Sequence, residues 1–586
     1  MTANVISLNI SAGIQKDGTV FDSPMYVDGR WVRFQRGRPR KMGGYRSIFI
    51  NVPSISRGMI MQSQTGLNYV YSGFFDSLKY WQTDDNNGVG SGPTSVTVNN
   101  FTSSTNNLWQ FDIGYDYNGT GALQLIAHPG QNLLNIDSTA ETPVLTGLFP
   151  GGTLSKVGVF TAVGNLSGTT ITIASENFLI GVGQVVTGTG IPASTTVTAA
   201  TVSSGTTTVT VSNSMTTGTS ITVTFDNNVS VSGGACMLYP YLFVYGNNGT
   251  IRNSSAGDFS NWIAADANEN SVSATKIVKG MAVRGGTTSP AGLFWSLDSL
   301  IRVTYSPTTI GASTLYWKYD IVTSQSSILS SQSVIEYDGI YYWCGVDRFL
   351  AYNGVVQEIK NNTNINYFFD NLNFNQRQKV WAAKIPRWGE IWWFYPHGDS
   401  EECNNAVIFN VRDQIWYDAG FAVGANRSAG VFSEVFKYPI WADNQENSLS
   451  NYSLWQHEIG TDTVYLSNVS AVESYFETNS IGWVGGGPGQ RTLQGANRWI
   501  RLERLEPDFV QTGDMSLVVT GKGYAEDVDD PSSPYAFSPS TLKLDLREQR
   551  REMRLKFISN TVGGNYQMGN VLISADIGDE RSTGNP

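Results

Sequence analysis

The chain has 586 residues, of which 40% are hydrophobic and only 15% are charged, and its net charge at pH 7 is −11. This length allows two to four domains, or one large repeat structure with appendages. The acidic balance excludes nucleic-acid binding driven by overall charge, and the three cysteines, Cys236, Cys344 and Cys403, exclude a disulfide framework. We expect these cysteines to be buried in strands. The sequence shows neither an N-terminal apolar signal segment nor an apolar run of about 18 residues, so it predicts no membrane span.

Residues 1–50 are predicted to form an extended N-terminal arm that ends in a basic hairpin. The stretch from 30 to 46 contains no acidic residue and seven basic ones: Arg30, Arg33, Arg36, Arg38, Arg40, Lys41 and Arg46. Three interpretations are open for it, namely a solvated hairpin, an arm that docks on an acidic protein surface, and a DNA contact. Because the whole chain is acidic, we expect docking on a partner protein or on a neighbouring subunit.

Residues 51–153 and 232–480 are predicted to be two parts of one radial β-structure. Aromatic and β-branched runs that are broken by Gly, Asn and Asp signal hairpins. Such runs occur at 66–81, 121–137, 242–262, 293–305, 340–354, 390–417 and 454–466. Their regular recurrence predicts a β-propeller of six to eight blades. We expect Trp262, at the end of one such turn, to lie in the core.

Residues 154–231 interrupt this pattern with a segment that is rich in Thr, Val, Gly and Ser and nearly uncharged. The alternation of Thr and Val predicts short antiparallel strands with one dry face. Loop tips tolerate insertions. We therefore predict a small β-sandwich-like module that is inserted into a propeller loop.

Residues 481–586 are predicted to be a C-terminal β region that closes the ring or forms a subunit interface. Alternation predicts one inward face for Leu544, Leu546, Met553, Leu555 and Phe557. The charged residues between them would then face outward, and Arg550, Arg551 and Arg554 are candidate interface residues. The fold class predicted for the whole chain is therefore all-β.

Candidate catalytic and metal-binding residues are few. His128, His397 and His457 are isolated from one another and from cysteine, so no zinc site is predicted and each histidine is expected to be structural. Two acidic loops, 84–88 and 526–530, are expected to be turns, since neither has the full pattern of a calcium loop. No nucleophile elbow is found. The sequence thus predicts no catalytic residue, no metal and no cofactor, and it predicts that the chain is not an enzyme.

Three parts of the sequence together resemble the tail-nozzle family of short-tailed bacteriophages, also called packaged-DNA stabilisation or tail-hub proteins. The first is 29–47 (GRWVRFQRGRPRKMGGYRS). The second is 240–259 with 341–373, and the third is 506–523 with 547–579. The first and third parts are the most specific. The module at 154–231 lies outside the resemblance.

The resemblance implies a structural virion protein, made in the host cytoplasm, whose six copies form a ring in the virus tail. That ring would extend the DNA channel below the portal and adaptor, retain packaged DNA and conduct it during ejection. The implied partners are the other copies, a tail adaptor or connector, and needle, fibre or spike proteins. Double-stranded DNA would pass without specific binding, because acidic walls repel it.

Two other functions are open. A carbohydrate-binding propeller, such as a receptor-binding adhesin, predicts aromatic side chains that cluster in an open pocket. A glycan hydrolase predicts two carboxylates at the separation used by glycosidases. Aromatic residues of blade strands usually lie in the core, which weakens both alternatives.

Overall fold

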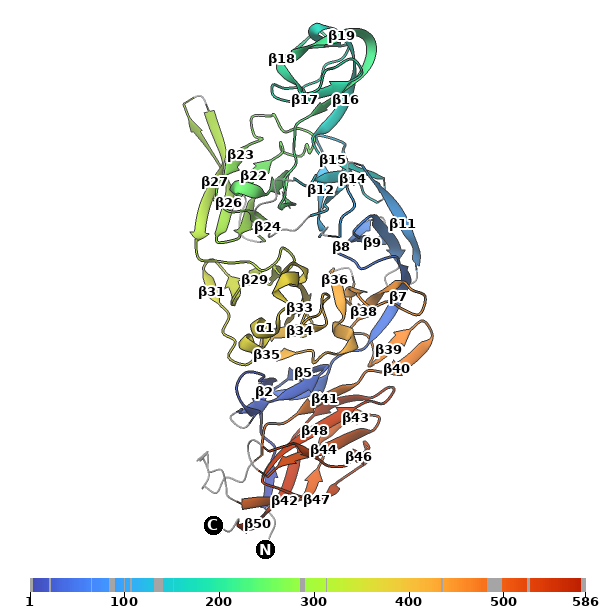
Figure 1. Cartoon of the computed structure of the whole chain (residues 1–586), viewed down its shortest axis with the longest axis vertical. Helices are drawn as coiled ribbons and strands as arrows, with labels where there is room; N and C mark the ends of the chain where they lie inside the picture. Colours follow the sequence, from blue (N-terminus) through green and yellow to red (C-terminus); the bar gives the residue numbers. More distant parts are fainter. Residues whose placement is uncertain are drawn as a thin grey trace. The chain divides into compact units, whose positions relative to one another are not determined.

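The computed structural model describes residues 4–20, 23–64, 66–83, 90–99, 101–105, 108–130, 141–150, 152–284, 290–311, 313–433, 436–481, 498–523 and 527–580. The chain divides into two compact units. Within one of them, Figure 1 shows N-terminal strands, drawn in blue, among C-terminal strands drawn in orange and red. Unit 1 combines residues 1–53 with residues 359–586, and unit 2 comprises residues 54–358. The N-terminal segment thus folds together with the C-terminal part of the chain.

Apart from the inserted segment, the described part of unit 2 holds one eight-stranded sheet and three four-stranded sheets. The eight-stranded sheet comprises two antiparallel groups of four strands, which we count as the first and second of five consecutive sheets. The first two sheets are joined edge to edge by the parallel pair β11–β15. The strands of the first two sheets are β8 (Met59–Gln64), β9 (Leu67–Gly73), β10 (Leu78–Thr83), β11 (Gly90–Val98), β12 (Gln110–Asp116), β13 (Ala122–His128), β14 (Leu145–Leu148) and β15 (Thr153–Lys156). The third and fourth sheets consist of β20 (Gly234–Leu238), β21 (Tyr241–Tyr245), β22 (Thr250–Asn253), β23 (Glu269–Ser271), β24 (Ile277–Ala282), β25 (Ala291–Ser296), β26 (Leu300–Ile310) and β27 (Ser313–Thr323), with the 3-10 turn η2 (Asn247–Gly249). The fifth consists of β28 (Ile335–Tyr337), β29 (Ile340–Cys344), β30 (Phe349–Tyr352) and β31 (Val356–Glu358).

The first strands of consecutive sheets are neighbours in unit 2, with β12 beside β8, β20 beside β12 and β24 beside β20. This is the blade arrangement of a propeller. Aromatic side chains fill the space between blades, since Phe243 lies 4.8 Å from Trp317 and Trp295 lies 5.7 Å from Trp343, measured between ring centroids. Trp262 is 4% exposed, which confirms its predicted place in the core.

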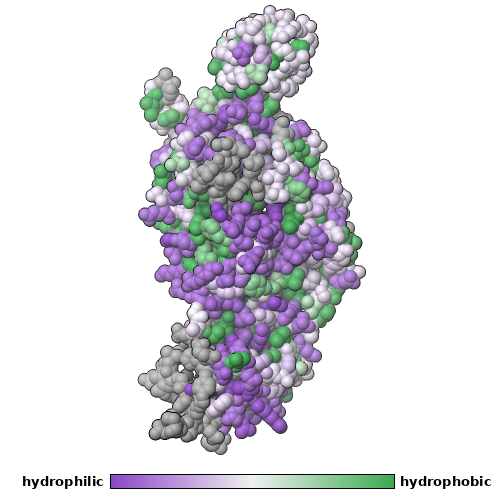
Figure 2. Space-filling model, in the orientation of Figure 1, coloured by the Kyte–Doolittle hydropathy of each residue, from purple (hydrophilic) through white to green (hydrophobic). Residues whose placement is uncertain are grey.

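The inserted segment forms a separate sheet in the order β16–β19–β17–β18. Its strands are β16 (Val159–Ile173), β17 (Val185–Gly188), β18 (Thr195–Ser203) and β19 (Thr206–Asp226). All members of its apolar cluster, from Leu166 to Phe225, belong to this segment. The module is pale in Figure 2, as expected for Thr, Ser, Gly and Val.

Unit 1 by itself holds two further sheets of the blade type, one of four strands and one of six. One consists of β32 (Trp381–Ile385), β33 (Glu390–Tyr395), β34 (Asn405–Asn410) and β35 (Ile415–Asp418), preceded by α1 (Ile365–Asn371) and η3 (Phe374–Lys379). The other consists of β36 (Arg427–Val431), β37 (Ile440–Asp443), β38 (Tyr452–His457) and the N-terminal strand β7 (Tyr45–Val52), with η4 (Val423–Ala425) before it and the hairpin β39 (Asp462–Tyr465) and β40 (Asn468–Ala471) beside β7. The described residues thus hold seven blade sheets, and the predicted class, an all-β propeller of six to eight blades, is confirmed.

The rest of unit 1 holds three sheets that interleave N-terminal and C-terminal strands, and one two-stranded parallel sheet of N-terminal strands only. The N-terminal strands are β1 (Asn4–Ser7), β2 (Ser11–Ile14), β3 (Met25–Tyr26), β4 (Asp28–Arg30), β5 (Val32–Gln35) and β6 (Arg38–Lys41). The C-terminal ones are β41 (Ser474–Glu477), β42 (Arg498–Glu506), β43 (Phe509–Thr512), β44 (Met515–Lys522), β45 (Asp530–Pro531), β46 (Tyr535–Phe537), β47 (Leu544–Arg550), β48 (Glu552–Ser559), β49 (Asn565–Met568) and β50 (Leu572–Glu580). Strand β1 pairs with β50, β4 with β41 and β6 with β49.

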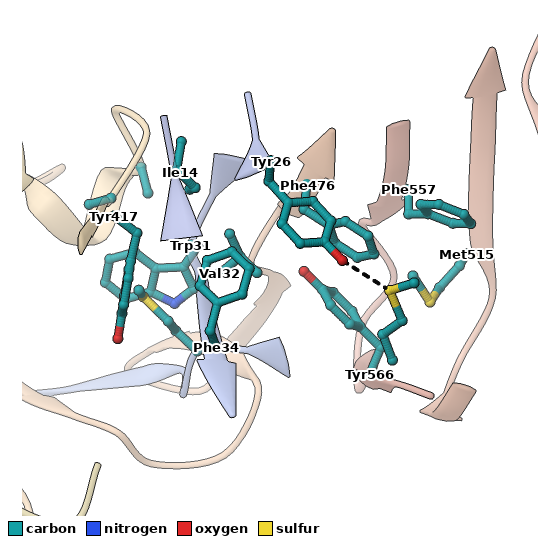
Figure 3. Packing of buried hydrophobic residues seen from close by; sticks show 14 of the residues in the cluster. Ile14, Tyr26, Trp31, Val32, Phe34, Tyr417, Phe476, Met515, Phe557 and Tyr566 are labelled. Atoms are coloured by element: carbon teal, nitrogen blue, oxygen red, sulfur yellow. Dashed lines mark hydrogen bonds between the residues drawn. The ribbon is translucent and has the colours of Figure 1, made fainter. Parts of the chain in front are cut away.

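The N-terminal strands lie at the centre of the unit 1 core (Figure 3). Phe34 packs on Tyr417 of a blade, at 5.5 Å between ring centroids, and Tyr26 packs on Phe476 of the C-terminal region, at 5.6 Å. Residues 1–50 were expected to form an extended arm, but nine of their side chains are members of this core: Leu8, Ile10, Ile14, Tyr26, Trp31, Val32, Phe34, Met42 and Tyr45. The predicted inward face of β47 and β48, from Leu544 to Phe557, is confirmed, because all five of its side chains are buried.

Candidate functional site

The basic hairpin predicted within 30–46 is formed by strands β5 and β6. Its tip, Arg36-Gly37, has φ angles of 53° and 73°, as a two-residue turn between antiparallel strands requires. The register places Arg33 directly opposite Arg40. Two like charges in this position destabilise a hairpin, so the surroundings must supply compensation.

The positive charge of Arg33 is neutralised by two carboxylates that lie far away in the sequence. Its side chain is 1% exposed. Nη1 and Nη2 each donate to Glu458 at 2.6 Å, and Nη2 also donates to Glu390 at 3.1 Å, while Nε lies 2.8 Å from Glu390 Oε1. Burial opposes the charge of Arg33, yet the two carboxylates hold its pKa above the ordinary value. Arg33 is therefore a buried, paired cation.

Glu390 is saturated with hydrogen bonds. Besides Arg33, Tyr417 Oη donates to it at 2.7 Å and Trp392 Nε1 donates at 2.9 Å. Burial raises the pKa of Glu390, and the negative charge of Glu458 acts in the same direction, against the effect of Arg33. Because every oxygen of Glu390 already has donors, this carboxylate serves the fold and is not open to a ligand.

Three guanidinium groups contact the indole ring of Trp388. The guanidinium carbons of Arg33, Arg40 and Arg387 lie 4.7, 4.8 and 4.9 Å from the ring centroid. The indole Nε1 donates to Glu458 at 3.0 Å, which fixes the ring. Cation–π attraction stabilises each contact. Among the described residues no carboxylate lies within ion-pair distance of Arg40 or Arg387, and Glu458 acts on Arg40 only from farther away.

A polar pocket of about 160 Å³ opens at this cluster in unit 1. Four basic side chains and one acidic side chain line it, together with Trp388, Tyr438, Thr461 and Asn565; the charged ones are Arg33, Arg40, Lys41, Arg387 and Glu458. Lys41 is 2% exposed, and its ammonium group donates to the Gly564 carbonyl at 2.8 Å. Burial lowers the pKa of Lys41 to about 8. The pocket therefore has a surplus of positive charge.

The other predicted interface residues of the hairpin region have partners within unit 1. Arg30 bonds to Glu473 at 2.9 Å, Arg38 to the Leu8 carbonyl at 3.0 Å and Arg46 to Gln456 at 2.8 Å. Arg36 is exposed at the hairpin tip. The prediction that this segment docks on a partner stays a prediction. The buried Arg33 and Lys41, however, present no outer surface to such a partner.

The C-terminal candidates, Arg550, Arg551 and Arg554, bind the neighbouring acidic loop and backbone. Arg550 pairs with Asp530 at 2.7 Å and Arg554 with Asp529 at 2.6 Å. Arg551 donates to the Gly523 carbonyl at 3.3 Å. The described part of the loop at 526–530, which was expected to be a solvated turn, is therefore tied to two arginines; its residue 526 lies outside the described residues, as do 84–88.

Two of the three histidines, His128 and His457, are buried. His128 is buried, with Nε2 2.6 Å from the Val231 carbonyl and Nδ1 accepting from Gly130 N, and burial lowers its pKa to about 4. His457 accepts from Arg427 Nε at 3.0 Å. All three cysteines are buried and free. Over the described ranges no group of three His, Cys, Asp or Glu side chains could hold a metal ion, and no helix has the length and apolarity to cross a membrane.

Sequence reasoning identified Arg33, Arg40 and Lys41 but not Glu390, Glu458, Arg387 or Trp388. One signal was available for Glu390. It begins a strand whose residues are all buried (EIWWFY), and an acidic residue in such a strand needs a buried cation. Glu458 and Arg387 stand in turns whose sequence holds no comparable signal.

No family model matches the chain, and no curated protein matches it. Among solved structures, an exo-β-1,3-galactanase from Phanerochaete chrysosporium in complex with β-1,3-galactotriose matches at 8% identity and a TM-score of 0.25, over 91% of this chain and 99% of that one. The same enzyme with galactose matches at 9% identity and a TM-score of 0.25, over 91% and 100%. A glycoside hydrolase matches at 10% identity and a TM-score of 0.23, over 90% and 99%.

These matches correct one expectation from the sequence, that the chain is not an enzyme, since the matched proteins are glycan-cleaving enzymes. Their names concern glycans and not virus tails. Identities of 8–10% and TM-scores of 0.23–0.25 transfer neither an activity nor residue roles to this chain. The carboxylates Glu390 and Glu458 also differ from a glycosidase pair, because an arginine side chain lies between them rather than a space for sugar.

Proposed function

We propose that this chain is a structural subunit of a virus-tail nozzle, which assembles with copies of itself into a ring around the DNA path. The observation that carries the proposal is the pairing of the two most specific parts of the resemblance. The stretch 29–47 and the stretch 547–579 are more than 500 residues apart, yet β6 pairs with β49, and β4 is linked through β41 to β48. One continuous structural body thus contains both.

The composition supports a subunit that is surrounded by neighbours. Charged residues make up 15% of the chain, whereas about a quarter is usual. Interfaces are depleted in charged residues at their centres. Six copies with a charge of −11 each would form a strongly acidic assembly, which repels passing DNA instead of binding it.

The test is the assembly itself. Mass photometry and negative-stain images of the purified chain, alone and mixed with tail adaptor protein, should show six-fold rings on the adaptor. Virus particles that lack the chain should package DNA and then leak it. A chain that stays monomeric with the adaptor, or particles that keep their DNA and infect without the chain, would refute the proposal.

A carbohydrate-binding role is the second candidate, and two exposed tyrosines of unit 2 favour it. Tyr117 and Tyr239 are 42% and 56% exposed, and their ring centroids are 6.4 Å apart. The ring of Tyr117 lies over Gly257, where an added Cβ would come within 2.3 Å of it. The two ring planes are tilted by 56° to each other, so the pair forms an angled apolar surface with polar tips, against which one face of a sugar ring could pack.

A glycan array tests this candidate. Binding to any glycan should disappear in Tyr117→Ala and Tyr239→Ala, but should persist in Tyr115→Ala, which removes another exposed tyrosine of β12. If the wild-type chain binds no glycan, or if all three variants bind alike, the platform has no such role.

A further inference from the structure

The pocket at Trp388 contains more positive charge than its own carboxylates neutralise. Glu458, its one acidic side chain, uses both oxygens on Arg33 and Trp388. In the part of the chain that the structure describes, Arg40, Lys41 and Arg387 have no ion-pair partner. The contacts of Arg40 are with the neutral Gln35 and Gln567, that of Lys41 is with a carbonyl and that of Arg387 is with the indole ring.

The surplus of positive charge in this pocket disfavours the charged forms of its basic side chains. Burial lowers the pKa of Arg40, and the charges of Arg33 and Arg387 lower it further, against the smaller opposite effect of Glu458. Burial likewise lowers the pKa of Lys41, and the nearby charge of Asp462 offsets this effect only in part. Cations that are held close together repel each other where carboxylates balance their charges only in part, and ionisable groups perturbed in this way cluster at functional sites. A bound anion would remove the repulsion.

We propose that this pocket binds a small oxyanion, a phosphate or carboxylate group, through Arg40, Lys41 and Arg387. Guanidinium forks match the oxygens of both groups and form charge-assisted hydrogen bonds with them. Trp388 packs against both arginines, since the guanidinium carbons of Arg40 and Arg387 lie within 5 Å of its ring centroid. Asn565 and Thr461 add neutral polar groups to the lining. The volume of about 160 Å³ holds several water molecules, and hence a group of this size.

The inference is independent of the nozzle proposal, because it concerns a ligand of one unit and not assembly. Isothermal titration calorimetry of the full chain at pH 7 with inorganic phosphate, with glucuronate and with glucose tests it. We expect binding of phosphate or glucuronate and no binding of glucose. Arg387→Gln should weaken binding about tenfold or more, the loss expected for a charge-assisted hydrogen bond. Arg36→Gln, at the exposed tip of the same hairpin, is the matched control and should bind as the wild type does.

A second calorimetric measurement tests whether Lys41 takes up a proton when the anion binds. At pH 8.5 the bound anion should draw a proton onto Lys41, so that the heat of binding depends on the ionisation enthalpy of the buffer. In Lys41→Gln that dependence should disappear. Should this buried variant fail to fold, Arg387→Gln still decides, because Arg387 is exposed.

The two ligands distinguish the source of the oxyanion. Binding of phosphate alone assigns the pocket to phosphate groups, binding of glucuronate alone assigns it to carboxylates, and both outcomes support the proposal. If neither anion binds, or if Arg387→Gln and Arg36→Gln bind equally well, the proposal is wrong.

Discussion

The N-terminal segment 4–52 and the inserted module 159–226 differ in where their side chains find partners. Every member of the module's apolar cluster comes from the module itself. The N-terminal segment instead packs on blades and on C-terminal strands, with partners such as Glu390, Tyr417 and Phe476 that are more than 350 residues away. The structure of a segment whose side chains pack on one another can be predicted from the pattern of its own residues. The structure of a segment whose partners are distant in the sequence cannot be predicted in this way, even where its composition is distinctive.

The largest effect that tests this comparison is expected from removal of the ion pairs between Arg33 and its two distant carboxylates. Arg33→Met leaves two buried carboxylates without a cation, which typically costs about 3–5 kcal/mol. Denaturant titration with tryptophan fluorescence should show this loss. Arg36→Met, on the same hairpin, should change the free energy of unfolding by about 0.5 kcal/mol or less. Equal effects of the two substitutions would mean that the segment does not depend on its buried ion pairs.

The titration of Lys41 gives the next largest effect. Its pKa is about 8 in the folded chain and about 10.4 in an unfolded one, so between these pH values the unfolded state binds more protons. Stability should therefore rise with pH in this window. From pH 8 to 9.5 the rise should be on the order of 2 kcal/mol larger in the wild type than in Lys41→Met, measured by denaturant titration at each pH. Parallel pH profiles of the two proteins would show that Lys41 is not desolvated.

Within the module a smaller and strictly local effect is expected. Ile171 is fully buried in the module's own cluster. Ile171→Val should cost about 0.5–1.5 kcal/mol, and hydrogen exchange should speed up in 159–226 only. Thr172→Val, at the exposed neighbouring position, is the control. Faster exchange in the blades would show that the module is coupled to them.

Removal of the whole module should have the smallest effect on the remainder. Asn227 N donates to the Gly158 carbonyl at 3.0 Å, so the ends of the module are already adjacent. With residues 159–226 replaced by a short Gly/Ser linker, the unfolding midpoint of the remaining chain should stay unchanged. A remainder that does not fold would show that the module is integral.

Sequence patterns predicted much of the fold, because strand alternation and turn formation depend on residues that are close together in the sequence. Aromatic runs between turn residues became blades, Thr/Val alternation became the module sheet, and alternation in 544–557 placed five side chains inward. The boundaries of the predicted domains stay predictions. The candidate site was predicted only in part, since charge alone does not tell a surface arginine from a buried one. Arg36 and Arg33 are three residues apart in one basic run, yet one is exposed and the other is buried.

The sequence by itself determined the all-β class, the blade repeats and the self-contained module, because strand periodicity and turn chemistry act over a few residues. Only the tertiary structure decided that the basic segment belongs to a core, that Arg33 joins Glu390 to Glu458, and that Trp388 collects three guanidinium groups. Those outcomes depend on desolvation and on charges brought together from 357 and 425 residues away. A sequence pattern read one segment at a time does not contain that information.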